Sequence, residues 1–424
     1  MNIEQSIDSL KRGVADNDFK LLYKEGANSL DRYVNTALKF EELFGNCDDV
    51  RIFSAPGRTE VGGNHTDHQH GRVLAGSVDL DIIGFVAPNN ENVVRIKSEG
   101  FKMDTVSLDE LEVNKSEFGK AIALIRGMCG VFKEKGYKIG GFNAYTTSNV
   151  FKGSGLSSSA AFEVFIGTVL NNMFNSGEIS AVEIAKIAQR SESEYFGKPC
   201  GLLDQSASSL GGFTFIDFKD SKSPVVESLA FDLAKHNHML CVVNTGGNHA
   251  NLTQDYADIT IECKSVSNFF YKDVLREVDQ KEFYKNIHKL KSKFGDRAVL
   301  RAIHFFNEDA RVVDEKKAIE NNNFDEFLKL VNESGNSSYK YLQNTYSTSA
   351  VNEQGINLAL ALTENFLKGR GACRVHGGGF AGTIQCYIPS ELINEYKQMI
   401  EKVFGENSCY VLKIRSVGGY EIKL

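Results

Sequence analysis

The segment from residue 141 to residue 174 constrains the fold of this chain more than any other. It begins with a strand-like run, GFNAYTT, passes through a loop of small residues, FKGSGLSSS, and continues as AAFEVFIGTVLNNMF, which has the length and apolar spacing of a helix. A strand that runs through a glycine-rich loop into a helix is typical of folds in which helices pack on sheets. The sequence therefore predicts a mixed α and β protein.

The rest of the chain supports that fold class. Apolar residues recur at steps of three or four among charges in residues 3–45, which predicts helices. A strand is expected from Arg51, and the Pro56-Gly57 pair predicts its end and the start of a long polar loop. Further strands are expected at 82–87, 93–96 and 239–245, a helix at 116–135, and helices through much of 250–370.

A chain of 424 residues exceeds the size of one simple core, so we expect two lobes. A polar break, KDSKSP, lies at 219–224. We predict a helical N-terminal extension over residues 1–48, an N-terminal lobe over 49–235 and a C-terminal lobe over 236–424. The extension is interpreted as a helical layer over an apolar surface, and a regulatory or subunit contact is the alternative.

Charge and composition exclude several classes of partner. A formal net charge of −7 offers no basic face to a nucleic acid. The start of the chain lacks the apolar core of a signal peptide and no apolar run reaches the length of a bilayer span, so we expect a cytoplasmic protein without a membrane partner. The eight cysteines are scattered, which indicates reduced, packed thiols instead of disulfides or a zinc site.

The central loop has the composition of an anion site. Glycines allow close backbone approach, a helix N-terminus offers unpaired N–H groups, and serine hydroxyls bind phosphate or magnesium. A serine-rich helix cap is the alternative interpretation. No Walker loop and no protein-kinase motif occurs in the chain. The candidate phosphate-binding residues are Gly153, Ser154, Gly155, Leu156, Ser157, Ser158 and Ser159.

Two other glycine-marked loops carry polar side chains. The first, residues 55–71, reads APGRTEVGGNHTDHQHG, and its density of hydrogen-bonding groups suits a polyhydroxylated ligand. A metal site on its histidines and a solvated polar loop are the alternatives. The second, RVHGGGFAG at 374–382, is weak alone because a tight strand connection has the same composition. Asp204 follows a Pro-Cys-Gly break and is either a cleft carboxylate or a helix cap.

Taken in order, four segments resemble the motifs of the GHMP kinase family, and among its members those of the galactokinases. They are APGRTEVGGNHTDH, KGSGLSSSAAFEV, CGLLDQSASSLGG and RVHGGGFAGT, and the resemblance spans about residues 51–415. It implies an α+β fold of two lobes, the first similar to the second domain of ribosomal protein S5 and the second ferredoxin-like. ATP and a sugar would meet between them.

The resemblance also implies roles for single residues. The enzyme would transfer the γ-phosphate of ATP to the C1 hydroxyl of a galactose-like sugar, with the loop 153–159 around the triphosphate. Ser159 and Glu192 match the positions that hold Mg²⁺, an ion that prefers such oxygen ligands. Asp204 matches the catalytic aspartate that accepts or orients the hydroxyl proton. Arg58 matches the cation that keeps Asp204 ionised.

The positions implied for sugar binding include one departure from galactokinases. Those enzymes usually have a glutamate before His-Thr-Asp, which binds the C6 hydroxyl, and a tyrosine after it. This chain has Asn64 and His68 there. Galactose is the preferred substrate, and the neutral amide makes a sugar with an acidic C6, such as galacturonate, the alternative. The predicted sugar-binding residues are Asn64, His65, Thr66, Asp67, Gly201 and Tyr256.

Two hypotheses from other classes stay open. A sensor on the same scaffold would bind sugar and ATP without catalysis, but it would have no need of Asp204, Arg58, Ser159 and Glu192 together. A metal-dependent hydrolase would use the histidines of residues 65–70. An ATP-dependent sugar kinase is the preferred hypothesis, with ATP and Mg²⁺ as its cofactors and a small sugar as its partner.

Overall fold

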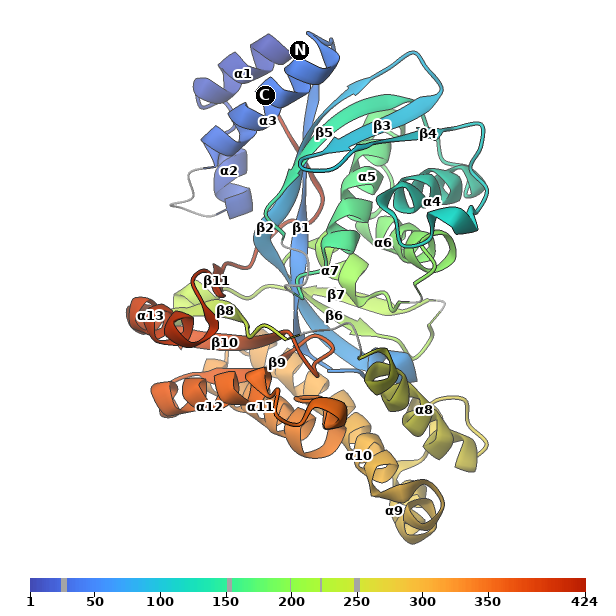
Figure 1. Ribbon diagram of the computed structural model, residues 1–424, viewed down its shortest axis with the longest axis vertical. Coiled ribbons are helices and arrows are strands. Elements are labelled where there is room, and N and C mark those ends of the chain that lie inside the picture. Colours follow the sequence, from blue (N-terminus) through green and yellow to red (C-terminus); the bar gives the residue numbers. More distant parts are fainter. Residues whose placement is uncertain (24–28, 151–154, 199, 222, 248–251) are drawn as a thin grey trace.

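The protein is described by a computed structural model that covers residues 1–23, 29–150, 155–198, 200–221, 223–247 and 252–424. Two sheets lie one above the other along the long axis, a large one in the N-terminal lobe and a smaller one in the C-terminal lobe (Figure 1). The predicted α+β fold with two lobes is confirmed.

The large sheet has the order β12-β1-β2-β5-β3-β4, and β6 and β7 extend it beside β2. Its pairs are antiparallel except β3 with β5, which are parallel. Its strands are β1 (Arg51–Gly62), β2 (Arg72–Pro88), β3 (Val93–Ser98), β4 (Met103–Ser107), β5 (Phe142–Ser148), β6 (Phe213–Asp217), β7 (Val225–Leu229) and β12 (Tyr420–Ile422).

Strand β1 does not end at Pro56-Gly57, so that prediction was wrong. The pairing with β2 shifts register between Pro56 and Arg58, and the strand then continues to Gly62. A bulge accommodates proline because the missing N–H falls where the ladder is already interrupted. Gly57 is needed there, since an added Cβ would lie 2.8 Å from the Leu156 carbonyl oxygen. The continued strand carries Arg58 into the space between the lobes.

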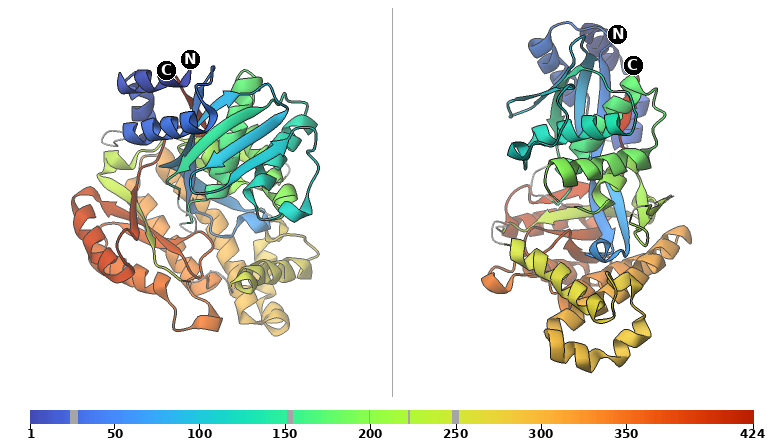
Figure 2. Two further views of the ribbon diagram at one scale, coloured as in Figure 1. Left: turned by 45° about the horizontal axis from the view of Figure 1, so that its top comes forward. Right: turned by 90° about the vertical axis from the view of Figure 1, so that its right-hand side faces the viewer.

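Helices cover both faces of the large sheet, as Figures 1 and 2 show. Alternate strand residues explain this, because Ile52 and Phe85 belong to one apolar cluster and Phe53 and Val86 to another. One face carries α1 (Ile3–Lys11), α2 (Asp16–Tyr23) and α3 (Leu30–Phe44), and the other carries α4 (Ala121–Glu134), α5 (Ser158–Phe174), α6 (Ala181–Arg190) and α7 (Leu203–Leu210).

The N-terminal helices are fixed to the sheet by polar contacts as well. Asp81 of β2 is fully buried and accepts hydrogen bonds from Tyr23 and from Arg32, both at 2.5 Å. Arg415, near the end of the chain, adds a third contact at 3.1 Å. The extension therefore lies as a packed layer of the N-terminal lobe.

The small sheet has the order β11-β8-β10-β9, all antiparallel. The last strand, β12, leaves this lobe and pairs with β1, so the chain end, predicted as part of the C-terminal lobe, belongs to the sheet of the N-terminal lobe. The remaining elements are β8 (His238–Asn244), β9 (Ala372–His376), β10 (Thr383–Pro389), β11 (Cys409–Leu412), α8 (Thr253–Phe269), α9 (Gln280–Lys285), α10 (Ile287–Glu320), α11 (Phe324–Ser337), α12 (Gly355–Leu367) and α13 (Ile393–Phe404).

The structure bears on what composition predicted for the cysteines and for membrane-spanning helices. All eight cysteines carry free thiols, and six of them are buried, as expected for packed residues. Among the described helices, none is long and apolar enough to cross a membrane.

Candidate active site

An ion pair between Arg58 and Asp204 forms the centre of the candidate site. Arg58 extends from β1, and Asp204 stands in the first turn of α7. Arg58 Nε donates to Asp204 Oδ1 at 2.6 Å, and another guanidinium nitrogen donates to the Gly155 carbonyl. Ser157 Oγ donates to the second oxygen of Asp204. The central loop, β1 and α7 therefore meet at one carboxylate.

The charges at this centre are fixed by their surroundings. Burial raises the pKa of Asp204, but the Arg58 guanidinium and the hydrogen bonds from Arg58 and Ser157 outweigh it, so the net pKa lies below the usual value. Burial lowers the pKa of Arg58, but Asp204, together with Glu60 and Glu192, outweighs it, so the net pKa is raised. Asp204 is thus a carboxylate at neutral pH, able to accept a further hydrogen bond.

The start of α5 is available to an anion. Ser157 adopts the left-handed conformation, with φ 59°, and its side chain makes no cap because its hydroxyl is bonded to Asp204. The first-turn N–H groups of α5 therefore keep their capacity for a phosphate. Ser158 and Ser159 lie in that turn, next to Gly155 and the buried Leu156. The predicted residues Gly153 and Ser154 fall outside the described residues.

Ser159 and Glu192 are brought together as predicted. Ser159 Oγ donates to Glu192 Oε1 at 3.0 Å, and Glu192 is almost fully buried. These hard oxygen donors fit Mg²⁺, with phosphate oxygens and water to complete its shell. Sequence reasoning missed two residues on the same carboxylate: Gln205 Nε2 donates to Oε2 at 2.7 Å, and Lys198 Nζ donates to Oε1 at 3.1 Å. Gln205 directly follows Asp204 and Lys198 lies six residues after Glu192, but nothing else in the sequence marks either side chain.

His65 and Asp67 lie at the edge of the same site. His65 Nε2 donates to the Gly378 carbonyl at 2.8 Å, which leaves Nδ1 as the acceptor of a neutral ring. Burial and the neighbouring His68 lower the pKa of His65 to about 4, so the ring is neutral at pH 7. Asp67 packs against Gly201, where an added Cβ would lie 2.4 Å from Asp67 Oδ2. Gly201 is therefore required by the position of that carboxylate.

Tyr256 enters the site from α8 of the other lobe. Its hydroxyl donates to the Gly379 carbonyl at 3.0 Å, and its ring stands perpendicular to Phe380. A side chain at Gly378 would collide with the ring, because an added Cβ would lie 2.6 Å from Tyr256 Cε1. The glycine loop at 374–382 thus holds His65 and Tyr256 together.

Asn64 and Thr66 are buried away from this edge. The Asn64 amide donates to Glu60 at 2.8 Å and to the Gly377 carbonyl at 2.7 Å. Its oxygen accepts from Asn344 at 2.8 Å and from Ser338 at 3.3 Å, so its hydrogen-bonding capacity is used within the protein. Thr66 is fully buried and donates to backbone carbonyls. Both side chains position the loop.

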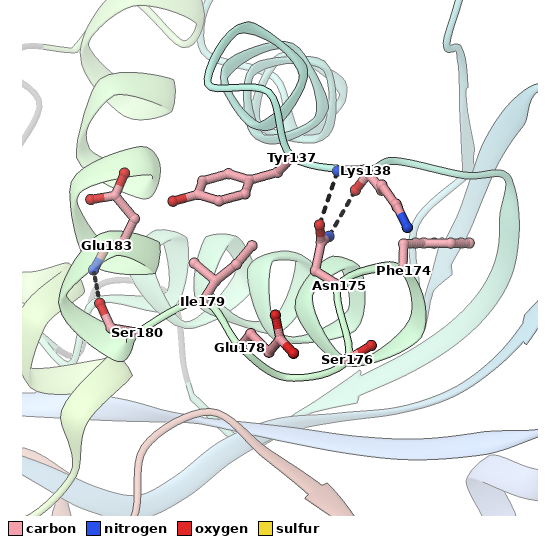
Figure 3. Close-up of a pocket in the computed structure, with 9 residues that line it drawn as sticks. All are labelled: Tyr137, Lys138, Phe174, Asn175, Ser176, Glu178, Ile179, Ser180 and Glu183. Atoms are coloured by element: carbon pink, nitrogen blue, oxygen red, sulfur yellow. Dashed lines mark hydrogen bonds between the residues drawn. The ribbon is translucent and has the colours of Figure 1, made fainter.

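One pocket adjoins this centre and another lies away from it. One, of about 600 Å³, has Asp67, His68 and Gly201 in its wall. The other, shown in Figure 3, lies between the end of α4 and the α5–α6 connection and holds none of the predicted site residues. Within the described part of the chain no group of three His, Cys, Asp or Glu side chains is arranged to hold a metal ion.

Comparisons with known proteins agree with this site. Residues 123–212 match the GHMP kinases N terminal domain, and residues 38–88 match the galactokinase galactose-binding signature. The two matches contain β1, the first loop, the central loop and Asp204. The chain belongs to the GHMP kinase family. The predicted family is therefore confirmed.

Relatives in this GHMP kinase family cover nearly the whole chain. A galactokinase of Clostridium tetani is 27% identical over 91% of this chain and 96% of its own length. A galactokinase of Glaesserella parasuis is 28% identical over 85% of this chain and 91% of its own length. The solved structure of Lactococcus lactis galactokinase complexed with galactose has a TM-score of 0.77 and 25% identity, and covers 92% of this chain and 99% of that one. A mevalonate kinase, at 16% identity and a TM-score of 0.61, shares the fold.

Proposed function

We propose that this protein is a galactokinase, which uses ATP to phosphorylate galactose at the C1 hydroxyl and releases ADP and galactose 1-phosphate. The observation that carries the proposal is the ion pair of Arg58 and Asp204, set between the uncapped start of α5 and the His65–Asp67 edge. Relatives named galactokinases, similar over most of the chain, support the same activity.

The residues divide the work of phosphoryl transfer. Asp204 orients the C1 hydroxyl and takes its proton as the bond from the sugar oxygen to phosphorus forms and the bond to the ADP oxygen breaks. Arg58 keeps Asp204 ionised and offsets charge on the transferring group. Bound Mg²⁺, held by Ser159 and Glu192, would neutralise phosphate charge. Because the transition state is loose, positioning and charge stabilisation outweigh proton removal.

The edge of the site favours a neutral sugar. Asp67 presents a carboxylate in the wall of the pocket, and His65 is neutral at pH 7. Both N–H groups of the Asn64 amide donate within the protein, so neither is available to a C6 carboxylate. A uronate would bring a further negative charge close to the Asp67 carboxylate, which is unfavourable. We therefore propose galactose over galacturonate.

The sugar contacts that we propose are His65 Nδ1, the Asp67 carboxylate, the backbone at Gly201 and Tyr256. They lie on different elements of both lobes, so they can address several hydroxyls of one ring. A site that bonds each hydroxyl discriminates strongly, because an unmatched buried group costs about 1–3 kcal/mol. The cytoplasmic location stays a prediction.

The test is turnover of a sugar panel. Purified protein with Mg²⁺ and ATP is offered galactose, galacturonate, glucose, N-acetylgalactosamine and arabinose, and ADP release is followed beside an Asp204→Asn variant. We expect galactose to be turned over fastest and the variant to be inactive. A preference for galacturonate would overturn the substrate. If calorimetry detects sugar binding but no sugar is turned over, the proposed enzymatic activity is wrong and a non-catalytic sensor is favoured.

A further inference from the structure

Lys198 reaches the candidate metal site from solvent. It lies between α6 and α7, in the segment FGKPCG, and its Nζ donates to Glu192 Oε1 at 3.1 Å. The Lys198 side chain is 62% exposed, whereas that of Glu192 is 1% exposed. The ion pair therefore links a buried carboxylate to a mobile, solvated chain of four methylenes.

The oxygen that Lys198 contacts is also the one that Ser159 contacts. Glu192 Oε1 accepts from Ser159 at 3.0 Å and from Lys198 at 3.1 Å, while Oε2 accepts from Gln205. The ammonium of Lys198 thus places a positive charge beside the two groups that we propose as Mg²⁺ ligands. Among the described residues, Lys198 has no second hydrogen-bond partner, so two of its three donors are available.

Lys198 also lies in the field of the catalytic carboxylate. Burial lowers the pKa of Lys198, but Glu192 and Asp204 outweigh it, and the net pKa is above the usual value. In turn, Lys198 is among the groups that lower the pKa of Asp204. A charged ammonium is therefore within electrostatic reach of the place where phosphoryl transfer occurs.

We propose that Lys198 is a second catalytic cation, which gives up Glu192 when the magnesium nucleotide binds and donates to an oxygen of the terminal phosphoryl group. This inference rests on the proposed kinase activity. Mg²⁺ held at Glu192 would displace the ammonium, and the long exposed side chain would then be free to turn to the triphosphate, whose charge needs a partner. Arg58 is fixed by Asp204 and Gly155, so Lys198 is the cation that can follow the moving group.

The test compares Lys198→Met with Lys198→Arg and with a control, Lys397→Met. Lys397 is also an exposed lysine near a glutamate, but it lies on α13. Calorimetry measures the binding of MgATP and of MgADP to each protein. We expect Lys198→Met to bind MgATP about 10-fold more weakly and MgADP almost unchanged, because only ATP carries the terminal phosphoryl group. Its kcat should fall about 10- to 100-fold, and Lys198→Arg should restore part of it.

Mn²⁺ alone gives a readout that does not depend on turnover. Without nucleotide, Lys198→Met should bind Mn²⁺ more tightly than the parent protein, since the ammonium no longer competes for Glu192. Equal losses of MgATP and MgADP binding, or kcat and MgATP affinity within twofold of the parent protein, would overturn the proposal and leave Lys198 as a loop tether. If the parent protein phosphorylates no sugar, the proposed function fails, but the ATP and ADP affinities still decide the role of Lys198.

Discussion

The amide nitrogen of Asn64 lies 2.8 Å from the carboxylate oxygen Oε1 of Glu60, and the same oxygen accepts from Arg374 of the other lobe at 2.9 Å. Asn64 also bonds Gly377 and Asn344, which belong to the C-terminal lobe. The residue that stands where galactokinases usually have a sugar-binding glutamate is therefore part of the junction between the lobes.

Asn64→Asp should destabilise the protein without changing its choice of sugar. The new carboxylate would face Glu60 and the Gly377 carbonyl, so two donors become acceptors in a buried site. We expect a loss of about 2–4 kcal/mol in the free energy of unfolding, larger at pH 8 than at pH 5 because protonation relieves the repulsion. Urea unfolding at both pH values measures it.

The control for that variant is Asn336→Asp, an exposed asparagine on α11, which should leave stability nearly unchanged. The order of sugars by kcat/KM should be the same in the parent protein and in Asn64→Asp. A switch of preference toward galacturonate, with stability retained, would contradict the junction role.

Gly201→Ala should impair sugar binding through Asp67. An added Cβ would lie 2.4 Å from Asp67 Oδ2, so the carboxylate must move. We expect KM for the sugar to rise about 10- to 100-fold, with a smaller effect on nucleotide affinity. Steady-state kinetics with varied sugar and varied ATP separates the two effects.

A double-mutant cycle shows whether Asp67 carries the effect. In an Asp67→Ala background the methyl group meets no carboxylate, so Gly201→Ala should cost much less there. The same cost in both backgrounds would mean that the glycine is needed for the backbone alone.

Asp204→Asn should lose turnover while it keeps sugar binding. The amide is nearly isosteric, but it cannot accept the hydroxyl proton, and it places a donor toward Arg58 or Ser157. We expect kcat to fall about 100- to 10,000-fold. Calorimetric sugar affinity should stay within a few-fold, and loss of binding together with turnover would indicate disruption of the site.

His65 should make the protein less stable as the pH falls from 7 to 5. Its pKa is lowered to about 4 by burial and by His68, whereas in the unfolded chain it is near 6.5. Between these values the unfolded state binds more protons, so acid favours unfolding. The contribution is about 1–2 kcal/mol over that interval.

Urea unfolding of the parent protein and of His65→Gln at pH 7 and pH 5 measures this contribution. The variant should lose less stability than the parent protein over the interval. The comparison with the variant is needed because the pKa values of His304 and His376 are also lowered by burial. Identical pH dependence in the two proteins would show that His65 is not responsible.

The local parts of the fold and the motifs were readable from the sequence. Periodicity gave α4, α5 and the strands around them, since apolar spacing reflects which face of an element is buried. The resemblance to GHMP kinases, which short continuous motifs carry, implied the glycine loops and the proximity of Ser159 to Glu192 and of Arg58 to Asp204. Lys198 and Gln205 adjoin these motifs, and nothing in the sequence distinguishes their side chains from those of other polar residues.

Only the tertiary structure decided the strand pairings and side-chain hydrogen bonds between elements that are far apart in the chain. Pairing with β2 carried β1 past Pro56, because a register shift absorbed the missing N–H. The last strand returned to β1, since that sheet edge offered hydrogen-bond partners. Asn64 was read as a sugar ligand from its motif, yet Asn344 and Gly377, about 300 residues away, saturate its amide. A sequence determines which groups a residue carries, whereas packing determines which of them remain free for a ligand.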